Sequence, residues 1–422
     1  MAETQPPTDQ ATQHGQTRPV TITAADGSTQ HLADLKPNAG ASIPDKQAIG
    51  DESEPLATYY ARVGIDNAQR VQMVKLAHMR YQHPDLDEIT TFLLDFGMHV
   101  VKRTPEQAWF RGYGPDQYVY SAQKGEKKFL GGAFEVESEA ELLKASRIAG
   151  AGPIRDLSDS ESPGGGRIVT LHDPEGFPVS FVYGIEPAPK HDYPEKVIYN
   201  YEGDDKPRVR KFNRFTPGPA AVHKLGHYGL CVKDFPAQLA WYTRNFNFAP
   251  TDFLYVPSGE GGDDGKVAKT KDVAVFAHID RGDTPVDHHT FFMSSNATAH
   301  VHHCSFEVHD YDTQHLGHQW LAGKEYKSVW GIGRHILGSQ LFDYCKSFFF
   351  AGRAVDCLIF SPLLLVNLVA DDQSTGWDTT GNMIEHYADG DLVNKDTPVG
   401  WGAAGDESLA VWGPEVPKWF LQ

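Results

Sequence analysis

Apolar and polar positions along the chain predict the same succession of elements twice. Residues 75–79, Lys-Leu-Ala-His-Met, and residues 224–228, Lys-Leu-Gly-His-Tyr, have related strand patterns. An Asp and then an amphipathic helix follow each of them, with the helices at 85–96 and 235–246. The order of elements is therefore the same in the two parts of the chain.

Two later segments continue this repeat. Residues 132–136, Gly-Ala-Phe-Glu-Val, are similar to residues 304–308, Cys-Ser-Phe-Glu-Val. The segment 173–180 matches 378–385, and each has an Asp-x-x-Gly turn between two predicted strands. Duplication of one unit is the simplest explanation.

Length and composition are those of a globular protein with more than one domain. A chain of 422 residues, 40% of them hydrophobic, can bury a large core and predicts two or three domains. Charge and proline over 204–220 indicate a linker. We therefore expect an N-terminal domain at 72–190 and a C-terminal domain at 221–395.

Both ends of the chain are expected to lie outside these domains. Residues 1–55 are too polar to fold alone and should be mostly disordered, although 20–32 could make a hairpin. Residues 396–422 are expected to form a C-terminal tail. The start lacks a basic segment followed by an apolar core, so no secretory signal is expected. The apolar run at 357–370 is too short to span a bilayer.

Charge and cysteine content narrow the choice of partners and compartment. The net charge of -18 opposes binding to nucleic acid and to anionic membranes, but it does not oppose binding of a small aromatic molecule. The four cysteines lack the spacing of a zinc knuckle or a disulfide framework, which indicates a reducing compartment. We therefore expect a cytoplasmic protein with a small-molecule substrate.

Three residues of the C-terminal copy form a candidate metal site. His227, His303 and Glu385 stand on separate predicted strands. Two imidazoles and one carboxylate can hold a divalent metal on one face and leave its other face open. The equivalent positions of the N-terminal copy are His78, Gly131 and Ser180. Because that copy lacks two of the three ligands, only the C-terminal copy is expected to bind metal.

Neighbouring residues compete for two of these ligand positions. Strand alternation sends the His302 and His303 side chains to opposite faces, so only one of them can be a ligand. Alignment with the other copy favours His303 and leaves His302 outward or supporting the site. His386 competes with Glu385, which we favour because it shares a strand face with Met383.

The stretches that contain these residues, 225–228, 302–308 and 381–385, resemble those of the vicinal oxygen chelate superfamily, and so does the repeat. Within that superfamily, they resemble the two-domain extradiol catechol dioxygenases. The similarity extends over about residues 72–395. It implies an α+β fold of paired βαβββ modules, two in each domain. It also implies that His227, His303 and Glu385 bind Fe(II), less often Mn(II), and that the substrates are O2 and a small aromatic diol. Such enzymes often assemble, so a homo-oligomer is compatible with the resemblance.

Three further residues match the same dioxygenases. In the run Asp-His-His-Thr-Phe-Phe at 287–292, the resemblance implies an acid–base role for His289. His335, with Tyr344 nine positions later, resembles the pair that contacts the substrate and stabilises developing negative charge. Tyr344 could instead simply pack in the barrel wall.

Other functions stay open at this point. A glyoxalase-like isomerase of the same superfamily generally takes two ligands from each half, which Gly131 and Ser180 disfavour. A hydroxyphenylpyruvate-type oxygenase is another member. A binding protein of the bleomycin-resistance type would need no metal. Iron content and O2 uptake with catechols would separate these functions.

Residues 345–375 are an insertion relative to such dioxygenases. There a tight turn joins the strands that carry the tyrosine and the glutamate, whereas here Tyr344 and Glu385 are 41 positions apart. One explanation is a retained intron, because residues 344–347 can be encoded with the donor sequence GTAAGT and residues 374–376 with an acceptor AG. The alternative is a genuine lid loop beside the site, since long loops are often functional.

Overall fold

The structure is a computed structural model of the chain. It describes residues 21–23, 29–31, 52–158, 161–189, 210, 217–257, 270–346, 383–405, 409–417 and 420. It divides into two units, Met1–Asp45 and Lys46–Gln422. In the first unit, β1 (Thr21–Thr23) and β2 (Thr29–His31) pair antiparallel, which confirms the hairpin predicted at 20–32. Most of the linker at 204–220 lies outside the described residues, and so does the insertion at 345–375 apart from its first two residues.

The N-terminal half of the second unit contains the βαβββ succession twice, after a short helix α1 (Leu56–Val63). The first module consists of β4 (Met73–His83), α2 (Leu86–Phe96), β5 (His99–Arg103), β6 (Gln107–Arg111) and β7 (Tyr120–Lys124). The second consists of β8 (Lys128–Val136), α3 (Glu139–Ala145), β9 (Arg155–Asp156), β10 (Arg167–His172) and β11 (Pro178–Tyr183). Their strands form one sheet in the order β5-β6-β7-β4-β8-β11-β10-β9.

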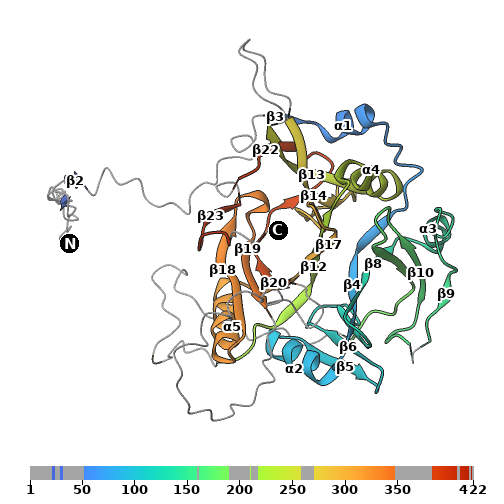
Figure 1. Cartoon of the computed structure of the whole chain (residues 1–422), viewed down its shortest axis with the longest axis horizontal. Coiled ribbons are helices and arrows are strands. Elements are labelled where there is room, and N and C mark those ends of the chain that lie inside the picture. Colours follow the sequence, from blue (N-terminus) through green and yellow to red (C-terminus); the bar gives the residue numbers. More distant parts are fainter. Residues whose placement is uncertain are drawn as a thin grey trace, which may run out of the picture. The chain divides into compact units, whose positions relative to one another are not determined.

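The C-terminal half repeats this plan. Its first module consists of β12 (Val222–Val232), α4 (Phe235–Asn245), β13 (Phe248–Pro257), β14 (Thr270–Ile279), β15 (Val286–Asp287) and β16 (Phe291–Ser295). Its second consists of β17 (His300–Val308), α5 (Tyr311–Gly323), β18 (Lys327–His335), β19 (Leu341–Lys346) and β20 (Met383–Ala388). Figure 1 shows the main strands curving around a common interior, with α4 and α5 outside. The expected α+β fold of paired βαβββ modules is confirmed.

The predicted helices form because each has a cap and an apolar face. Asp85 caps α2 by accepting hydrogen bonds from the amides of Asp87 and Glu88, and Asp234 caps α4 by accepting from the amide of Ala237. One face of α2 is buried in the main core. The helix predicted from the apolar pattern at 85–96 is therefore confirmed to within one residue.

Strand pairing repeats between the halves as closely as the order of elements does. In the N-terminal half, β4 pairs antiparallel with β8, and β8 pairs parallel with β11. In the C-terminal half, β12 likewise pairs antiparallel with β17, and β17 pairs parallel with β20. The ladder of β4 and β8 shifts register beside His78 and Arg80, and that of β12 and β17 shifts beside His227 and Gly229. Even the irregularities of the sheet are therefore duplicated, as expected of repeated units.

Both ends of the chain add strands to the second sheet. β22 (Val399–Ala403) pairs with β13 on one side and with β3 (Glu52–Glu54) on the other. β23 (Ala410–Trp412) pairs with β18. The expectation of a tail at 396–422 is therefore wrong for these residues, because their main chain satisfies its hydrogen bonds at sheet edges that a short sequence pattern does not reveal. None of the helices in the described residues combines the length and the hydrophobicity that a membrane span requires.

One of the contacts between the two halves lies where α2 meets α5 and β20. Asp95 at the end of α2 accepts hydrogen bonds from Trp320 Nε1 (3.1 Å) and from the Tyr326 hydroxyl (3.0 Å). His386 of β20 donates from Nε2 to the carbonyl oxygen of Phe96 (2.7 Å), and its ring stacks on that of Phe96. The strand that carries Glu385 is thus held from behind by the N-terminal half.

Candidate metal centre

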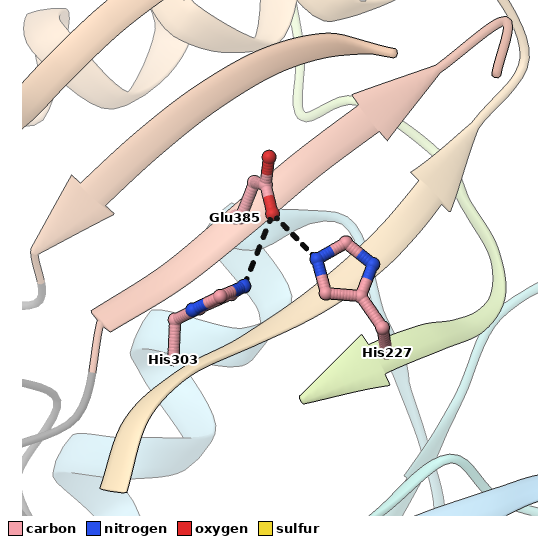
Figure 2. Close-up of side chains that lie close together, drawn as sticks. All are labelled: His227, His303 and Glu385. Atoms are coloured by element: carbon pink, nitrogen blue, oxygen red, sulfur yellow. Dashed lines mark ion pairs between the residues drawn. The ribbon is translucent and has the colours of Figure 1, made fainter. Parts of the chain in front are cut away.

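Three neighbouring strands, β12, β17 and β20, carry the predicted ligands. His227 on β12 and Glu385 on β20 both lie opposite Ser305 of the central strand β17. His303 stands two residues before Ser305, and therefore on the same face. Figure 2 shows the three side chains pointing toward one another from these strands.

The distances between these side chains fit a divalent metal. His227 Nε2 lies 3.2 Å and His303 Nε2 lies 3.8 Å from Glu385 Oε2, and one ligand atom from each residue lies within 4.8 Å of the others. Ligand atoms that are about 2.0–2.2 Å from one ion stand roughly 3–4 Å apart. Three buried atoms of this group have no hydrogen-bond partner among the described residues: both carboxylate oxygens of Glu385 and Nε2 of His303. A bound cation would satisfy these polar atoms.

His302 orients His303 rather than pointing away from it. Both side chains are buried, and their Nδ1 atoms are 2.6 Å apart. The prediction that alternation sends them to opposite faces is wrong, because the register of β12 and β17 shifts at this point and His302 occupies the bulge.

The hydrogen bonds of His302 also fix the tautomer of His303. Nε2 of His302 lies 2.7 Å from the carbonyl oxygen of Phe420, which can only accept, so this nitrogen carries the proton. Nδ1 of His302 then accepts from Nδ1 of His303. The lone pair of His303 is left on Nε2, toward Glu385, as a metal ligand requires.

Glu385 and His386 lie on opposite faces of β20. The His386 ring contacts Phe96 in the N-terminal half, whereas the Glu385 carboxylate faces His227 and His303. The geometry therefore favours Glu385 over His386 as the third ligand. Metal binding by these residues stays a prediction.

An apolar cavity adjoins the three residues. His303, His289, His335 and Tyr344 contribute to its lining. The His289 ring centroid lies 4.2 Å from that of His227. His335 Nε2 lies 3.2 Å from the Tyr344 hydroxyl and 4.0 Å from Glu385 Oε1. The structure thus brings together all six residues singled out in the sequence.

Burial sets the protonation of the groups around the cavity. Burial, and next the charge of nearby histidines, lowers the pKa of both His289 and His303 well below the ordinary histidine value. Burial also lowers the pKa of His302 to about 4. The pKa of Tyr344 is raised well above the usual tyrosine value by burial and then by the charge of Glu385. At neutral pH these imidazoles are neutral and the phenol keeps its proton.

Sequence reasoning missed three residues that support the site. Asp252 accepts a hydrogen bond from His288, which in turn lies against His289. Phe420 supplies the carbonyl for His302 and a ring to the cavity wall. His288 could have been found as the neighbour of His289, but Asp252 and Phe420 carry no sequence signal because folding alone brings them to the site.

The chain is similar in sequence to proteins of known families. The sequence profile of the Glyoxalase/Bleomycin resistance protein/Dioxygenase superfamily matches residues 224–345. Metapyrocatechase 2 of Cupriavidus necator is 25% identical over 356 residues, which are 82% of this chain and 90% of that protein.

Two solved structures share the fold at low sequence identity. Homoprotocatechuate 2,3-dioxygenase from Arthrobacter globiformis has a TM-score of 0.59 at 18% identity, covering 84% of this chain and 92% of its own. A Mn(II)-bound glyoxalase from Novosphingobium aromaticivorans has a TM-score of 0.58 at 17% identity, covering 83% of this chain and 98% of its own. The chain therefore carries a domain of the glyoxalase/bleomycin resistance protein/dioxygenase superfamily at residues 224–345 and has the fold of the two-domain extradiol dioxygenases.

Proposed function

We propose that this protein is an extradiol, meta-cleaving dioxygenase that acts on a catechol-type aromatic diol with O2 and a non-haem divalent metal, Fe(II) or less often Mn(II). One observation supports this above all others. Two imidazoles and one carboxylate converge beside an apolar cavity whose wall also carries acid–base and hydrogen-bonding side chains.

Each of the six residues has a role in this proposal. His227, His303 and Glu385 would hold the metal, which when bound would acidify one diol hydroxyl and bring the diol and O2 together. His289 would accept the second hydroxyl proton at Nε2 and later return it to oxygen. His335 and Tyr344 would hydrogen-bond the substrate oxygens.

The rest of the cavity suits a flat, mostly apolar ring. Phe276, Phe292, Trp330 and Phe420 contribute to its wall. Its volume of about 120 Å³ far exceeds the roughly 10–15 Å³ that one water molecule needs. Aromatic walls of this kind would bury the ring and limit the access of water to the reacting oxygens.

The relatives support a dioxygenase activity, whereas one structurally similar protein leaves an isomerase activity as the alternative. One relative is named metapyrocatechase 2 and one structural neighbour is named homoprotocatechuate 2,3-dioxygenase, while the Novosphingobium structure is named a glyoxalase. The N-terminal copy has Gly131 and Ser180 at two ligand positions, which disfavours a centre that takes ligands from both halves. We also expect the cytoplasm as the compartment, since its reducing conditions preserve Fe(II).

The fate of molecular oxygen tests the proposal. The protein is loaded anaerobically with Fe(II), mixed with a panel of catechols and exposed to ¹⁸O2. We expect a yellow ring-opened hydroxymuconic semialdehyde that contains both atoms of one O2. An enzyme that takes up no O2 but isomerises the hemithioacetal of methylglyoxal and glutathione would be a glyoxalase instead.

A further inference from the structure

A line of three buried side chains leads from β13 to the cavity wall. His288 Nε2 lies 2.7 Å from Asp252 Oδ2, and His288 Nδ1 lies 3.1 Å from His289 Nδ1. Exposed fractions are 4% for Asp252, 0% for His288 and 3% for His289. Beyond this line, the His289 ring contacts His227 and faces the cavity.

These contacts select one tautomer for each imidazole. A carboxylate can only accept, so Nε2 of His288 carries a proton that it donates to Asp252. In a neutral His288, Nδ1 is then an acceptor, and the facing Nδ1 of His289 must be the donor. The lone pair of His289 is consequently on Nε2, the ring nitrogen that does not face His288.

The main chain is built to hold the His288 ring in this place. The Thr251 hydroxyl donates to the carbonyl oxygen of His288 (2.7 Å), and the His288 amide donates to the carbonyl oxygen of Asp391 (3.0 Å). Gly338 has φ +74°, and a Cβ there would lie 2.8 Å from the His288 ring. Any other residue at 338 would be strained and would displace the imidazole.

A buried carboxylate beside an imidazole stabilises a protein core less than packed apolar side chains do. Desolvating Asp252 costs free energy that a packed apolar side chain would avoid. The His302–His303 pair has the same geometry, with the Phe420 carbonyl in place of the carboxylate. In both pairs, an acceptor outside the pair fixes the tautomer of the first histidine. The first histidine then fixes the tautomer of the second, which lies at the site.

We propose that Asp252 and His288 are positioning residues that keep the proton of His289 on Nδ1 and its Nε2 lone pair available to the substrate. This inference rests on the proposed function for the acid–base role of His289. The tautomers themselves do not depend on that function, so they can be tested separately.

Nuclear magnetic resonance of the metal-free protein tests the tautomers without any substrate. Long-range ¹H–¹⁵N spectra of protein labelled with ¹⁵N-histidine distinguish Nδ1–H from Nε2–H rings, and His288→Asn and His289→Asn assign the two signals. We expect Nε2–H for His288 and Nδ1–H for His289. In Asp252→Asn, His288 should lose its single tautomer. A doubly protonated His288, or an Nε2–H tautomer of His289, would overturn the proposal.

Kinetics of the Fe(II)-loaded enzyme test the consequence for turnover. Asp252→Asn keeps the shape of the side chain and should lower kcat roughly 10–100-fold, with metal content unchanged and KM little affected. The control is Asp173→Asn, which changes a buried carboxylate of the N-terminal half that accepts from Tyr242 and should leave kcat unchanged.

The two measurements separate failure of this inference from failure of the proposed function. Wild-type kcat in Asp252→Asn, or an equal loss in Asp173→Asn, would contradict a positioning role. If the wild-type protein cleaves no catechol, the proposed function fails, and the spectra alone then decide whether Asp252 and His288 fix the His289 tautomer.

Discussion

At the scale of single residues, the N-terminal and C-terminal halves differ at the positions that would hold a metal. Gly131 occupies the position of His303, with φ +100° and room so limited that a Cβ would lie 2.3 Å from the Pro178 carbonyl oxygen. Ser180 occupies the position of Glu385 and accepts a hydrogen bond from Arg80 (2.9 Å). The N-terminal copy therefore lacks the site because of its backbone geometry and the partly buried Arg80 guanidinium, as well as its residue identities.

His227 and His78 are equivalent positions that should respond oppositely to mutation. Removing a ligand should weaken Fe(II) or Mn(II) binding by more than roughly 100-fold, since mutation of residues that merely support the ligands already lowers metal affinity about 10–100-fold. We therefore expect His227→Ala to lose metal, whereas His78→Gln keeps one metal per chain. Metal analysis after anaerobic loading and desalting measures both variants. Equal losses in the two would contradict the assignment of the site to the C-terminal half.

The residues that could be predicted from sequence are those that the repeat aligns, together with His289, His335 and Tyr344, which the resemblance to extradiol dioxygenases implies. His227, His303 and Glu385 were identifiable because the N-terminal copy supplied a frame in which their counterparts are His78, Gly131 and Ser180. The orientation of His302 could not be predicted, because a bulge breaks the alternation on which such reasoning depends. The Asp252–His288 contact joins residues 36 positions apart and exists only after folding.

At the scale of elements, β19 and β20 form an antiparallel ladder despite the long segment between them. Tyr344 pairs with Glu385 and Cys345 pairs with Ile384, the register of two strands joined by a tight turn. The insertion at 345–375 is thus not needed to bring Tyr344 to the site. Whether it is a retained intron stays a prediction, because most of it lies outside the described residues.

Shortening this connection tests the intron hypothesis in the protein itself. Replacing residues 345–376 by one Trp gives the chain that splicing would leave. We expect the variant to fold, to bind metal and to gain about 1 kcal/mol or more in free energy of unfolding, since each halving of the length of a connection contributes roughly 0.6 kcal/mol. Urea unfolding and metal analysis measure this. A folded, metal-loaded variant without activity would indicate a lid loop instead.

A second contact between elements makes stability depend on pH. His318 of α5 lies 2.9 Å from the buried Asp343 carboxylate of β19, and this hydrogen bond raises the pKa of His318. A raised folded-state pKa stabilises the protein below the ordinary histidine pKa of about 6.5, and the stabilisation is lost as the pH rises through the folded-state value.

His318→Gln removes this charge and keeps a side chain of similar reach. The difference in free energy of unfolding between wild type and variant should therefore be largest near pH 5.5 and shrink by pH 9. Urea titrations across this range give the difference directly. A difference that grows with pH would show that protonated His318 does not stabilise the fold.

At the scale of the whole molecule, the N-terminal half supports the site although it supplies none of the six site residues. α2 receives the Trp320 and Tyr326 hydrogen bonds at Asp95, and Phe96 anchors His386 beside Glu385. The overall plan could be predicted from the repeat. The contacts between halves could not, because neither α2 nor α5 signals its partner in its own pattern.

Asp95→Ala should loosen this junction. It removes the acceptor of the hydrogen bonds from Trp320 and Tyr326, which costs about 1–3 kcal/mol. Asp87→Ala on the same helix removes only an exposed ion pair with Arg103 and should cost about 1 kcal/mol or less. Thermal unfolding of the two variants makes the comparison. A smaller loss for Asp95→Ala than for Asp87→Ala would mean that the junction contributes little to stability.

Oxygen uptake by the Fe(II)-loaded protein tests the central claim most directly. With catechol as substrate, we predict that the wild type consumes one O2 for each ring opened, that chelation abolishes uptake, and that Glu385→Ala shows none. Uptake that persists after thorough chelation, or that Glu385→Ala retains, would contradict a metal held by His227, His303 and Glu385.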